Sequence, residues 1–279
     1  METKKESYIK LMKKFKRLYT NGSSITHGWP LNQKDYRDYY KENFGWEWDV
    51  TSPELEVDSK ISINWPNRLA KILNAELIDE SRGGGSSIRA MRMTMEWCEQ
   101  NLDKVKNTLF VIETTAGYRD EIWFNKLNRY YNLTIGNIEN PKDLTDSEED
   151  RKIIQKELES YIKNMIDEEH HSKKEAEQFV KFYSFMKTIG AEFFIVNQAI
   201  RHHTAHHYKN FFLKYKLDDR IIKFEEHNDC MSGWYINDRK TALRDELKGY
   251  TDDLHPSYTA HIEVANEIHK YIKNFYGKI

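Results

Sequence analysis

The sequence of 279 residues predicts an α/β fold built on a doubly wound parallel sheet. Short apolar segments that look like strands cover residues 17–20, 75–79, 108–115, 191–197 and 220–225. Longer helical or irregular stretches separate these segments, and this alternation is typical of parallel α/β proteins. The third and fourth segments contain unbroken apolar runs, Leu-Phe-Val-Ile and Phe-Phe-Ile-Val. Such runs indicate strands that are buried on both faces of a sheet.

Helical patterns fill the gaps between the predicted strands. A helix is expected over residues 66–73, because Pro66 suits a first helical turn and apolar residues share one face. Further helices are expected over residues 87–101, within the long charged stretch 147–189, and at the C-terminal end over residues 261–275.

Two stretches look like insertions into this core. Residues 30–64 are rich in Tyr and Trp, and residues 125–171 are charged and helical in character. The aromatic stretch could stack on sugar rings, cover a cleft or form a small core of its own. Since neither repeats nor low-complexity tracts occur, we expect one domain over residues 1–279 with two insertions.

The composition argues against nucleic-acid-binding, membrane and disulfide-rich proteins. A formal net charge of −2 provides no field that would attract nucleic acid or an anionic membrane. The two cysteines form neither a disulfide framework nor a zinc-ribbon spacing. The lysine-rich start lacks the apolar segment of a secretory signal, and no window approaches the ~18 apolar residues of a membrane span. We therefore expect a cytoplasmic protein with no nucleic-acid or membrane partner; the oligomeric state stays open.

Chemistry-bearing residues follow the first predicted strand and precede the last helix. Residues 22–26 read Gly-Ser-Ser-Ile-Thr and stand where a strand ends, at the edge of the sheet where ligands bind in α/β proteins. Residues 252–256 read Asp-Asp-Leu-His-Pro. A serine nucleophile needs a base within reach and a group that orients the base, and an Asp-x-x-His segment supplies both. Asp252 is favoured over Asp253 as the orienting group because of its spacing from His255.

A glycine-rich segment follows the second predicted strand. Residues 81–87 read Ser-Arg-Gly-Gly-Gly-Ser-Ser, and glycines beside a helix start let backbone N–H groups approach a ligand closely. Such groups could form an oxyanion hole. A phosphate-binding loop is the competing interpretation, but the segment lacks the Gly-Lys-Ser/Thr ending and the Gly-x-Gly-x-x-Gly pattern.

Taken in chain order, the segments 22–26, 81–87 and 252–256 resemble sequence blocks of the SGNH (GDSL-like) hydrolases. The resemblance is to divergent members with a Gly-x-Ser-x-Thr first block. The resemblance runs from Lys16 to Ile272. It implies a three-layer α/β/α sandwich with a five-stranded parallel sheet of the flavodoxin-like type. It also implies that Ser24 is the nucleophile, His255 the general base and Asp252 its partner, with the backbone N–H groups of Ser24 and Gly84 in the oxyanion hole. No metal or organic cofactor is implied.

Two blocks depart from the family pattern. The first has Ser23 where an Asp is usual. The third block of the family follows the third strand, which here is residues 114–121, Thr-Thr-Ala-Gly-Tyr-Arg-Asp-Glu. This segment lacks the usual Gly-x-Asn-Asp, whose Asn donates to the oxyanion, and Thr115 or Arg119 could replace that donor. Losing one such donor costs about 3 kcal/mol in the transition state.

The function expected from these residues is hydrolysis of a small acyl ester, with a carbohydrate O-acetyl group as the favoured substrate. Arg82 and Arg119 could hold an anionic substrate or form salt bridges. Two alternatives remain: an acyltransferase that uses the same site, and a binding protein that keeps the fold without catalysis. Residues 202–207, His-His-Thr-Ala-His-His, have spacings that can bind zinc, but without a carboxylate or cysteine at a matching offset we expect no metal site.

Overall fold

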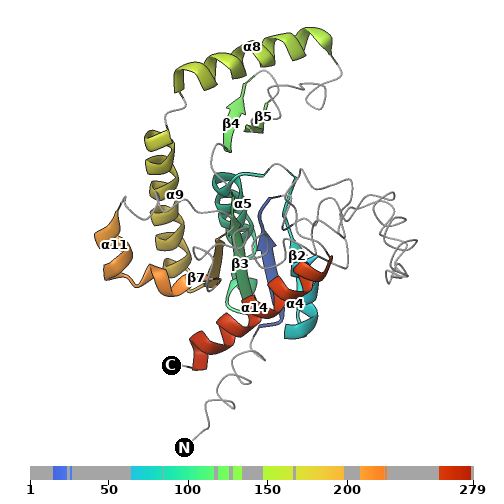
Figure 1. Cartoon of the computed structure of the whole chain (residues 1–279), viewed down its shortest axis with the longest axis vertical. Helices are drawn as coiled ribbons and strands as arrows, with labels where there is room; N and C mark the ends of the chain where they lie inside the picture. Colours follow the sequence, from blue (N-terminus) through green and yellow to red (C-terminus); the bar gives the residue numbers. More distant parts are fainter. Residues whose placement is uncertain are drawn as a thin grey trace, which may run out of the picture.

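The computed structural model describes a parallel sheet with helices on both faces (Figure 1). The described residues are 15–23, 26, 64–83, 85–115, 119–125, 128–133, 147–165, 168–197, 208–222, 224 and 258–277. The predicted fold class, a three-layer α/β/α sandwich around a five-stranded parallel sheet, is confirmed.

The strands of the sheet match the five predicted segments. They are β1 (Arg17–Asn21), β2 (Glu76–Asp79), β3 (Thr108–Thr114), β6 (Glu192–Asn197) and β7 (Ile221–Ile222). The last strand is shorter than predicted. Their order in the sheet is β2-β1-β3-β6-β7, and all neighbours are parallel. Numbered along the chain, this is the order 2-1-3-4-5 of the flavodoxin-like folds.

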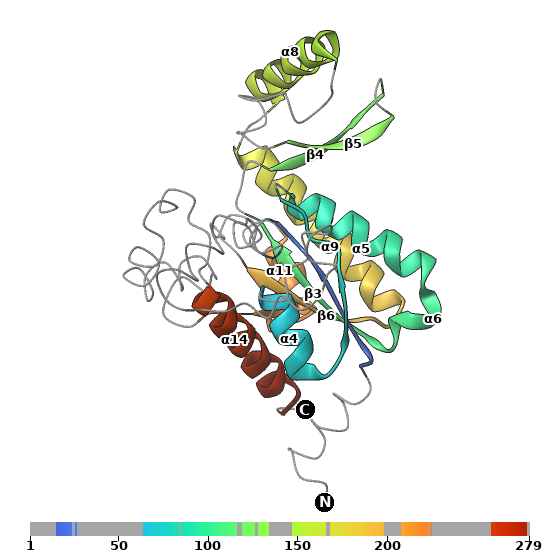
Figure 2. The same ribbon diagram turned by 90° about the vertical axis from the view of Figure 1, so that its right-hand side faces the viewer.

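Helices cover the two faces of this sheet (Figure 2). On one face lie α4 (Trp65–Leu73) and α14 (Tyr258–Gly277), and on the other lie α5 (Ser87–Gln100) and α9 (Glu168–Thr188). The predicted stretch 147–189 is two helices, α9 and the preceding α8 (Glu148–Met165). Shorter helical segments are α6 (Leu102–Val105), α11 (Lys209–Lys214) and η3 (Leu217–Arg220).

Alternate residues of β3 build the two cores. Leu109 and Val111 belong to the core under α4 and α14, whereas Phe110 and Ile112 belong to the core under α5 and α9. This follows from the two-residue period of a strand, because both faces of β3 are covered. By the same period, Glu113 faces the α4–α14 layer.

Side-chain caps set the starts of two of these helices. The Asn64 side chain accepts a hydrogen bond from the backbone N–H of Asn67 at the start of α4, and Pro66 follows in the first turn. The Ser86 side chain does the same for Arg89 at the start of α5. Both caps stand at the edge of the sheet where β1, β2 and β3 end.

An antiparallel hairpin, which the sequence did not lead us to expect, follows β3. It consists of β4 (Asp120–Phe124) and β5 (Arg129–Leu133). The hairpin and α8 lie beyond the end of the sheet at which β1 finishes (Figures 1 and 2). The insertion predicted over residues 125–171 therefore contains a strand as well as helix. Of the aromatic stretch 30–64, all but Asn64 lies outside the described residues.

Within the described part of the chain, no helix combines the length and the apolar character that crossing a bilayer requires.

Candidate active site

The candidate site lies where the strand order of the sheet reverses. In a 2-1-3-4-5 sheet the reversal falls between β1 and β3, and ligands bind outside the carboxyl ends of these two strands. Gly22 and Ser23 follow β1 directly, and Thr115 follows β3. The first motif predicted from the sequence therefore begins at the edge where this fold places its binding sites.

Glu113 is the polar centre of this edge. It is fully buried at the end of β3, and its carboxylate is bound by residues that follow β1. The Ser23 hydroxyl donates to Oε1 at 2.9 Å, and the backbone N–H groups of Ser23 and Thr26 donate to Oε2 at 3.3 and 3.0 Å. The Thr26 hydroxyl also donates to Oε2. One carboxylate thus binds both sides of the Gly-Ser-Ser-Ile-Thr motif.

Burial raises the pKa of Glu113 to about 7, because desolvation penalises the charged form. The donors on Ser23 and Thr26 and the charge of Arg119 act in the opposite direction. Burial also lowers the pKa of Arg119, and Glu113 counters this shift. Glu113 can therefore change its protonation state near neutral pH.

The glycine-rich segment packs directly on the turn after β1. The backbone N–H of Arg82 donates to the Gly22 carbonyl at 3.1 Å, and that of Gly85 donates to the Arg82 carbonyl at 2.9 Å. A Cβ atom on Gly85 would lie 2.8 Å from the Gly22 oxygen. A Cβ atom on Gly22 would lie 2.5 Å from both Glu113 Oε2 and Thr26 Oγ1. These close approaches require glycine at both positions.

Thr115 is bound to the start of α5. Its backbone N–H donates to Ser87 Oγ at 2.9 Å, and its hydroxyl accepts from the Ser87 N–H at 3.2 Å. Ser87 also bonds with Glu175 of α9, whose pKa burial raises. Thr115 is buried, and its backbone N–H donates within this network.

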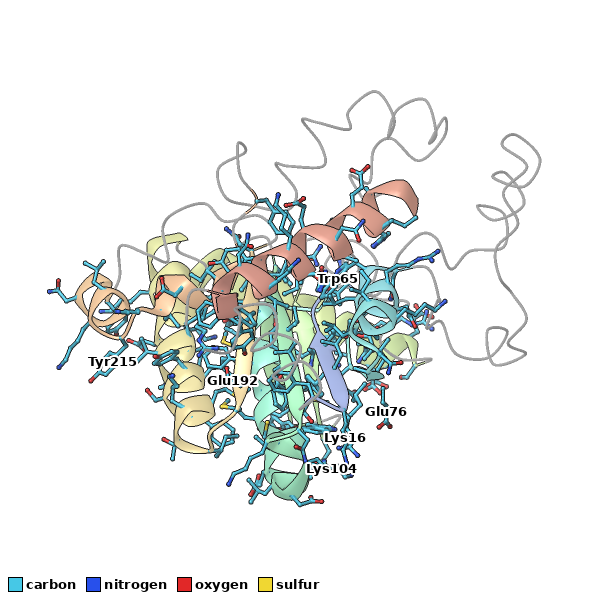
Figure 3. All side chains as sticks on the ribbon, turned by 90° about the horizontal axis from the view of Figure 1, so that it is seen from below. Lys16, Trp65, Glu76, Lys104, Glu192 and Tyr215 are labelled. Carbon is cyan, nitrogen blue, oxygen red and sulfur yellow. The ribbon has the colours of Figure 1, made fainter. Side chains whose placement is uncertain are left out.

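A hydrogen-bonded path connects the first motif to the last helix. The Asn64 side-chain amide donates to the Thr26 carbonyl at 3.0 Å, and the next residue, Trp65, donates its backbone N–H to His261 Nδ1 at 3.2 Å. Trp65 and His261 are both fully buried. Figure 3 shows Trp65 at the start of α4, next to α14. Residues 26 and 261, near opposite ends of the sequence, therefore lie close together at this edge.

Two buried oxygens beside the turn accept or donate nothing within the described structure. They are Asp79 Oδ2 and Ser81 Oγ, at the end of β2. The other oxygen of Asp79 accepts from the Thr20 hydroxyl at 3.0 Å and the Ser81 N–H at 3.1 Å. Leaving a buried polar atom without a partner costs about 1–3 kcal/mol.

The four residues to which the resemblance assigns the chemistry lie outside the described part of the chain: Ser24, Gly84, Asp252 and His255. Their roles stay predictions. Of the arginines proposed to hold substrate, Arg82 is exposed, and Arg119 points one nitrogen at the Gly85 carbonyl, 3.5 Å away.

Metal binding has no candidate in the described structure. Among the described residues, no group of three or more His, Cys, Asp or Glu side chains could hold an ion. The histidines of segment 202–207 lie outside those residues.

Sequence analysis missed the residues that organise this edge, namely Glu113, Asn64 and His261. One signal for Glu113 was present, since an acidic residue directly follows four apolar residues within a strand. A buried carboxylate in such a place needs partners, and this requirement points to polar residues at a neighbouring strand end. Asn64 could have been found as a residue that precedes Trp-Pro at a helix start.

The fold is that of a doubly wound α/β protein whose strand order reverses between β1 and β3, the position outside which ligands bind in folds of this kind. A family model described as a family of unknown function (DUF6071) matches residues 50–206, and the chain belongs to this family. No curated protein matches the sequence.

Distant likenesses to solved structures cover most of the chain. The crystal structure of TesA has a TM-score of 0.45 at 10% identity, covering 93% of this chain and 99% of that one. The psychrotrophic esterase EstA from Pseudoalteromonas sp. has a TM-score of 0.46 at 12% identity, covering 93% and 97%. The acetyl xylan esterase Est2A from Butyrivibrio proteoclasticus has a TM-score of 0.43 at 13% identity, covering 93% and 64%. At these values the likenesses say nothing about the activity of this chain.

Proposed function

We propose that this chain is a single-domain serine esterase of the SGNH type that hydrolyses a small acyl ester. Ser24 is the nucleophile, His255 the general base and Asp252 the group that orients it. The favoured substrate is an O-acetyl ester of a carbohydrate, and the reaction requires neither a metal nor an organic cofactor.

The observation that carries this proposal is the path from Thr26 through Asn64 and Trp65 to His261. Thr26 follows Ser24 by two residues, and His261 follows His255 by six. A nucleophile and its base must come within hydrogen-bond reach of each other. The proximity of their neighbours in sequence supports a shared site at the carboxyl ends of β1 and β3.

In the proposed reaction, Ser24 Oγ attacks the ester carbonyl while His255 accepts its proton, and the alcohol then leaves with that proton. Water releases the acyl group from Ser24 in the second half of the reaction. The backbone N–H groups of Ser24 and Gly84 would stabilise the oxyanion. The packing of Gly85 and Arg82 against Gly22 supports bringing the glycine-rich segment to this turn.

Hydrolysis of p-nitrophenyl acetate by the wild type and by Ser24→Ala and His255→Ala variants tests the proposal. We expect both variants to lose activity by a factor of about 10⁴ or more, because triad members act as a unit. The matched control is Ser257→Ala, which removes a hydroxyl two residues after His255 in the sequence and outside the proposed triad. Equal turnover by the wild type and Ser24→Ala would refute the assignment of the nucleophile.

A second candidate, a binding protein without catalysis, is favoured by the surroundings of Thr115. Its backbone N–H donates to Ser87 Oγ and its hydroxyl oxygen accepts from the Ser87 N–H, so the backbone N–H is not directed at an oxyanion while these bonds persist. A fluorophosphonate probe separates the two candidates, since it labels an activated serine covalently. Labelling of Ser24 supports the esterase; retained binding of a glycan without labelling supports the binding protein.

A further inference from the structure

The carboxylate of Glu113 binds the motif on both sides of Ser24. It accepts hydrogen bonds from the backbone N–H and the hydroxyl of Ser23, the residue before Ser24, and from the same two groups of Thr26, two residues after it. The side chain is fully buried and belongs to β3, so the turn is bound to the middle of the sheet.

Space around Gly22 shows how closely the turn fits this carboxylate. A Cβ atom at Gly22 would lie 2.7 Å from Glu113 Cβ as well as 2.5 Å from Oε2. Real Cβ atoms essentially never come so near another heavy atom. The backbone of the turn thus runs in direct contact with the Glu113 side chain, and the position of one depends on the other.

We infer that Glu113 is the positioning residue of the nucleophile turn, holding the backbone on either side of Ser24 against the end of β3. This inference rests on the proposed function, because it assigns a purpose to a contact with the segment that carries the proposed nucleophile. Resemblance to known blocks does not point to it, since Glu113 lies in the strand before the third block.

The donors on the turn define which variant can replace Glu113. Oε2 receives two backbone N–H groups, which cannot reverse their direction, whereas Oε1 faces the Ser23 hydroxyl, which can. A glutamine can therefore place its oxygen at the position of Oε2 and let its amide donate to Ser23 Oγ. Leucine offers neither group. Glu113→Gln keeps the positioning contacts and Glu113→Leu removes them.

Two measurements on the full chain test the inference. The first is amide hydrogen exchange at Ser23 and Thr26, which reports the turn without any reaction. The second is the rate at which a fluorophosphonate labels Ser24. A matched control is Leu109→Ala, which creates a cavity in the same strand and lowers stability, away from the edge.

We expect Glu113→Leu to expose both amides to exchange and to slow labelling about a hundredfold, as displacement of a reacting group by about 1 Å can do. Glu113→Gln should keep both close to wild type, and Leu109→Ala should lose stability while its folded form labels at the wild-type rate. If Glu113→Leu leaves the exchange or the labelling unchanged, the inference is overturned and the proposed function stands. If the wild type itself is not labelled, the proposed function fails, and with it a role in positioning a nucleophile.

Discussion

Glu113 near the end of β3 and Glu121 in β4 both have buried side chains, and the protein binds their carboxylates in different ways. Glu113 is bound by neutral donors on Ser23 and Thr26. Glu121, at the start of the β4–β5 hairpin, forms a bidentate ion pair with Arg92 of α5. Arg92 Nε donates to Glu121 Oε2 at 2.6 Å, and Arg92 Nη2 donates to Oε1 at 2.7 Å. The Arg92 guanidinium also bonds with Glu96 and lies 4.1 Å from the centre of the Tyr130 ring.

Charged and neutral partners have different consequences for the two carboxylates. A guanidinium that meets a carboxylate through two parallel bonds fixes orientation strongly and favours the charged form of both partners. Accordingly, the Glu121 contact raises the pKa of Arg92. Neutral donors can bind Glu113 in either protonation state. The Ser23 hydroxyl donates to the carboxylate, and it can turn to accept a hydrogen bond from the carboxylic acid. The hairpin is thus anchored by charge, whereas the turn after β1 is held by a group that can exchange a proton near neutral pH.

The largest change in stability is expected from breaking the ion pair between Arg92 and Glu121. Arg92→Leu should lower the free energy of unfolding by about 3 kcal/mol, because it leaves the Glu121 carboxylate, whose side chain is 3% exposed, buried without its partner. Urea unfolding measures this change. Removing the carboxylate as well, in Arg92→Leu with Glu121→Leu, should recover part of the loss.

An exposed pair is the control for this variant. Lys152→Leu breaks the pair between Lys152 and Glu148 on α8, whose side chains are 74% and 79% exposed, and should change stability by no more than about 0.5 kcal/mol. If Arg92→Leu is as mild as this control, the hairpin is not anchored by charge.

The raised pKa of Glu113 should make the stability of the protein depend on pH. The pKa of Glu113 is raised from 4.5 to about 7 in the folded chain, so the folded state keeps a proton that the unfolded state releases between these values. Stability from this group is complete below pH 4.5 and is lost as pH rises to 7, by about 3 kcal/mol in total. Glu113→Gln lacks this titration.

Denaturant unfolding of both proteins at about pH 4, 6 and 8 measures the difference. Relative to Glu113→Gln, the wild type should become progressively less stable with rising pH. A difference that is constant with pH would show that Glu113 keeps an ordinary pKa.

A smaller effect is expected from crowding the turn. Gly22→Ala should cost about 1–3 kcal/mol, since its Cβ atom would collide with Glu113 and Thr26. Gly83→Ala is the matched control, because a Cβ atom there meets nothing within 4 Å. Thermal unfolding distinguishes them, and equal stability of the two variants would mean that the turn does not press on Glu113.

The smallest change in stability, with a distinct effect on reactivity, is expected from Asn64→Ser. Serine caps a helix about as well as asparagine, but the buried Thr26 carbonyl loses its donor, so the free energy of unfolding should fall by about 1 kcal/mol. Because this contact holds the turn after β1, labelling of Ser24 by a fluorophosphonate should slow about tenfold. An unchanged labelling rate would show that Asn64 acts as a cap alone.

The sequence predicted the sheet well because the strands carry their own signal. Runs such as residues 109–112 and 193–196 leave no doubt that both faces are covered, and the structure buries them all. The hairpin was missed because β4 and β5 mix charged and aromatic residues, so their pairing depends on anchors elsewhere, such as Arg92 and Lys174. Tertiary contacts of this kind cannot be read from a local pattern.

The candidate site was predicted in part. Residues 22–26 were singled out because they follow a predicted strand, and their start does lie at the switch point of the sheet. Glu113 was missed because a single acid at the end of an apolar run resembles a strand boundary. Its hydrogen bonds to the turn can be foreseen only when β1 and β3 are placed side by side, with Asn21 opposite Ile112. The path through Asn64 to His261 likewise joins residues separated by 196 positions between Trp65 and His261.

Mass spectrometry of the wild-type chain after fluorophosphonate treatment tests the central claim most directly. A single adduct on the peptide that contains Ser24, absent from His255→Ala, is the predicted result. An adduct confined to another residue, or none under conditions that label a known serine esterase, would contradict the account.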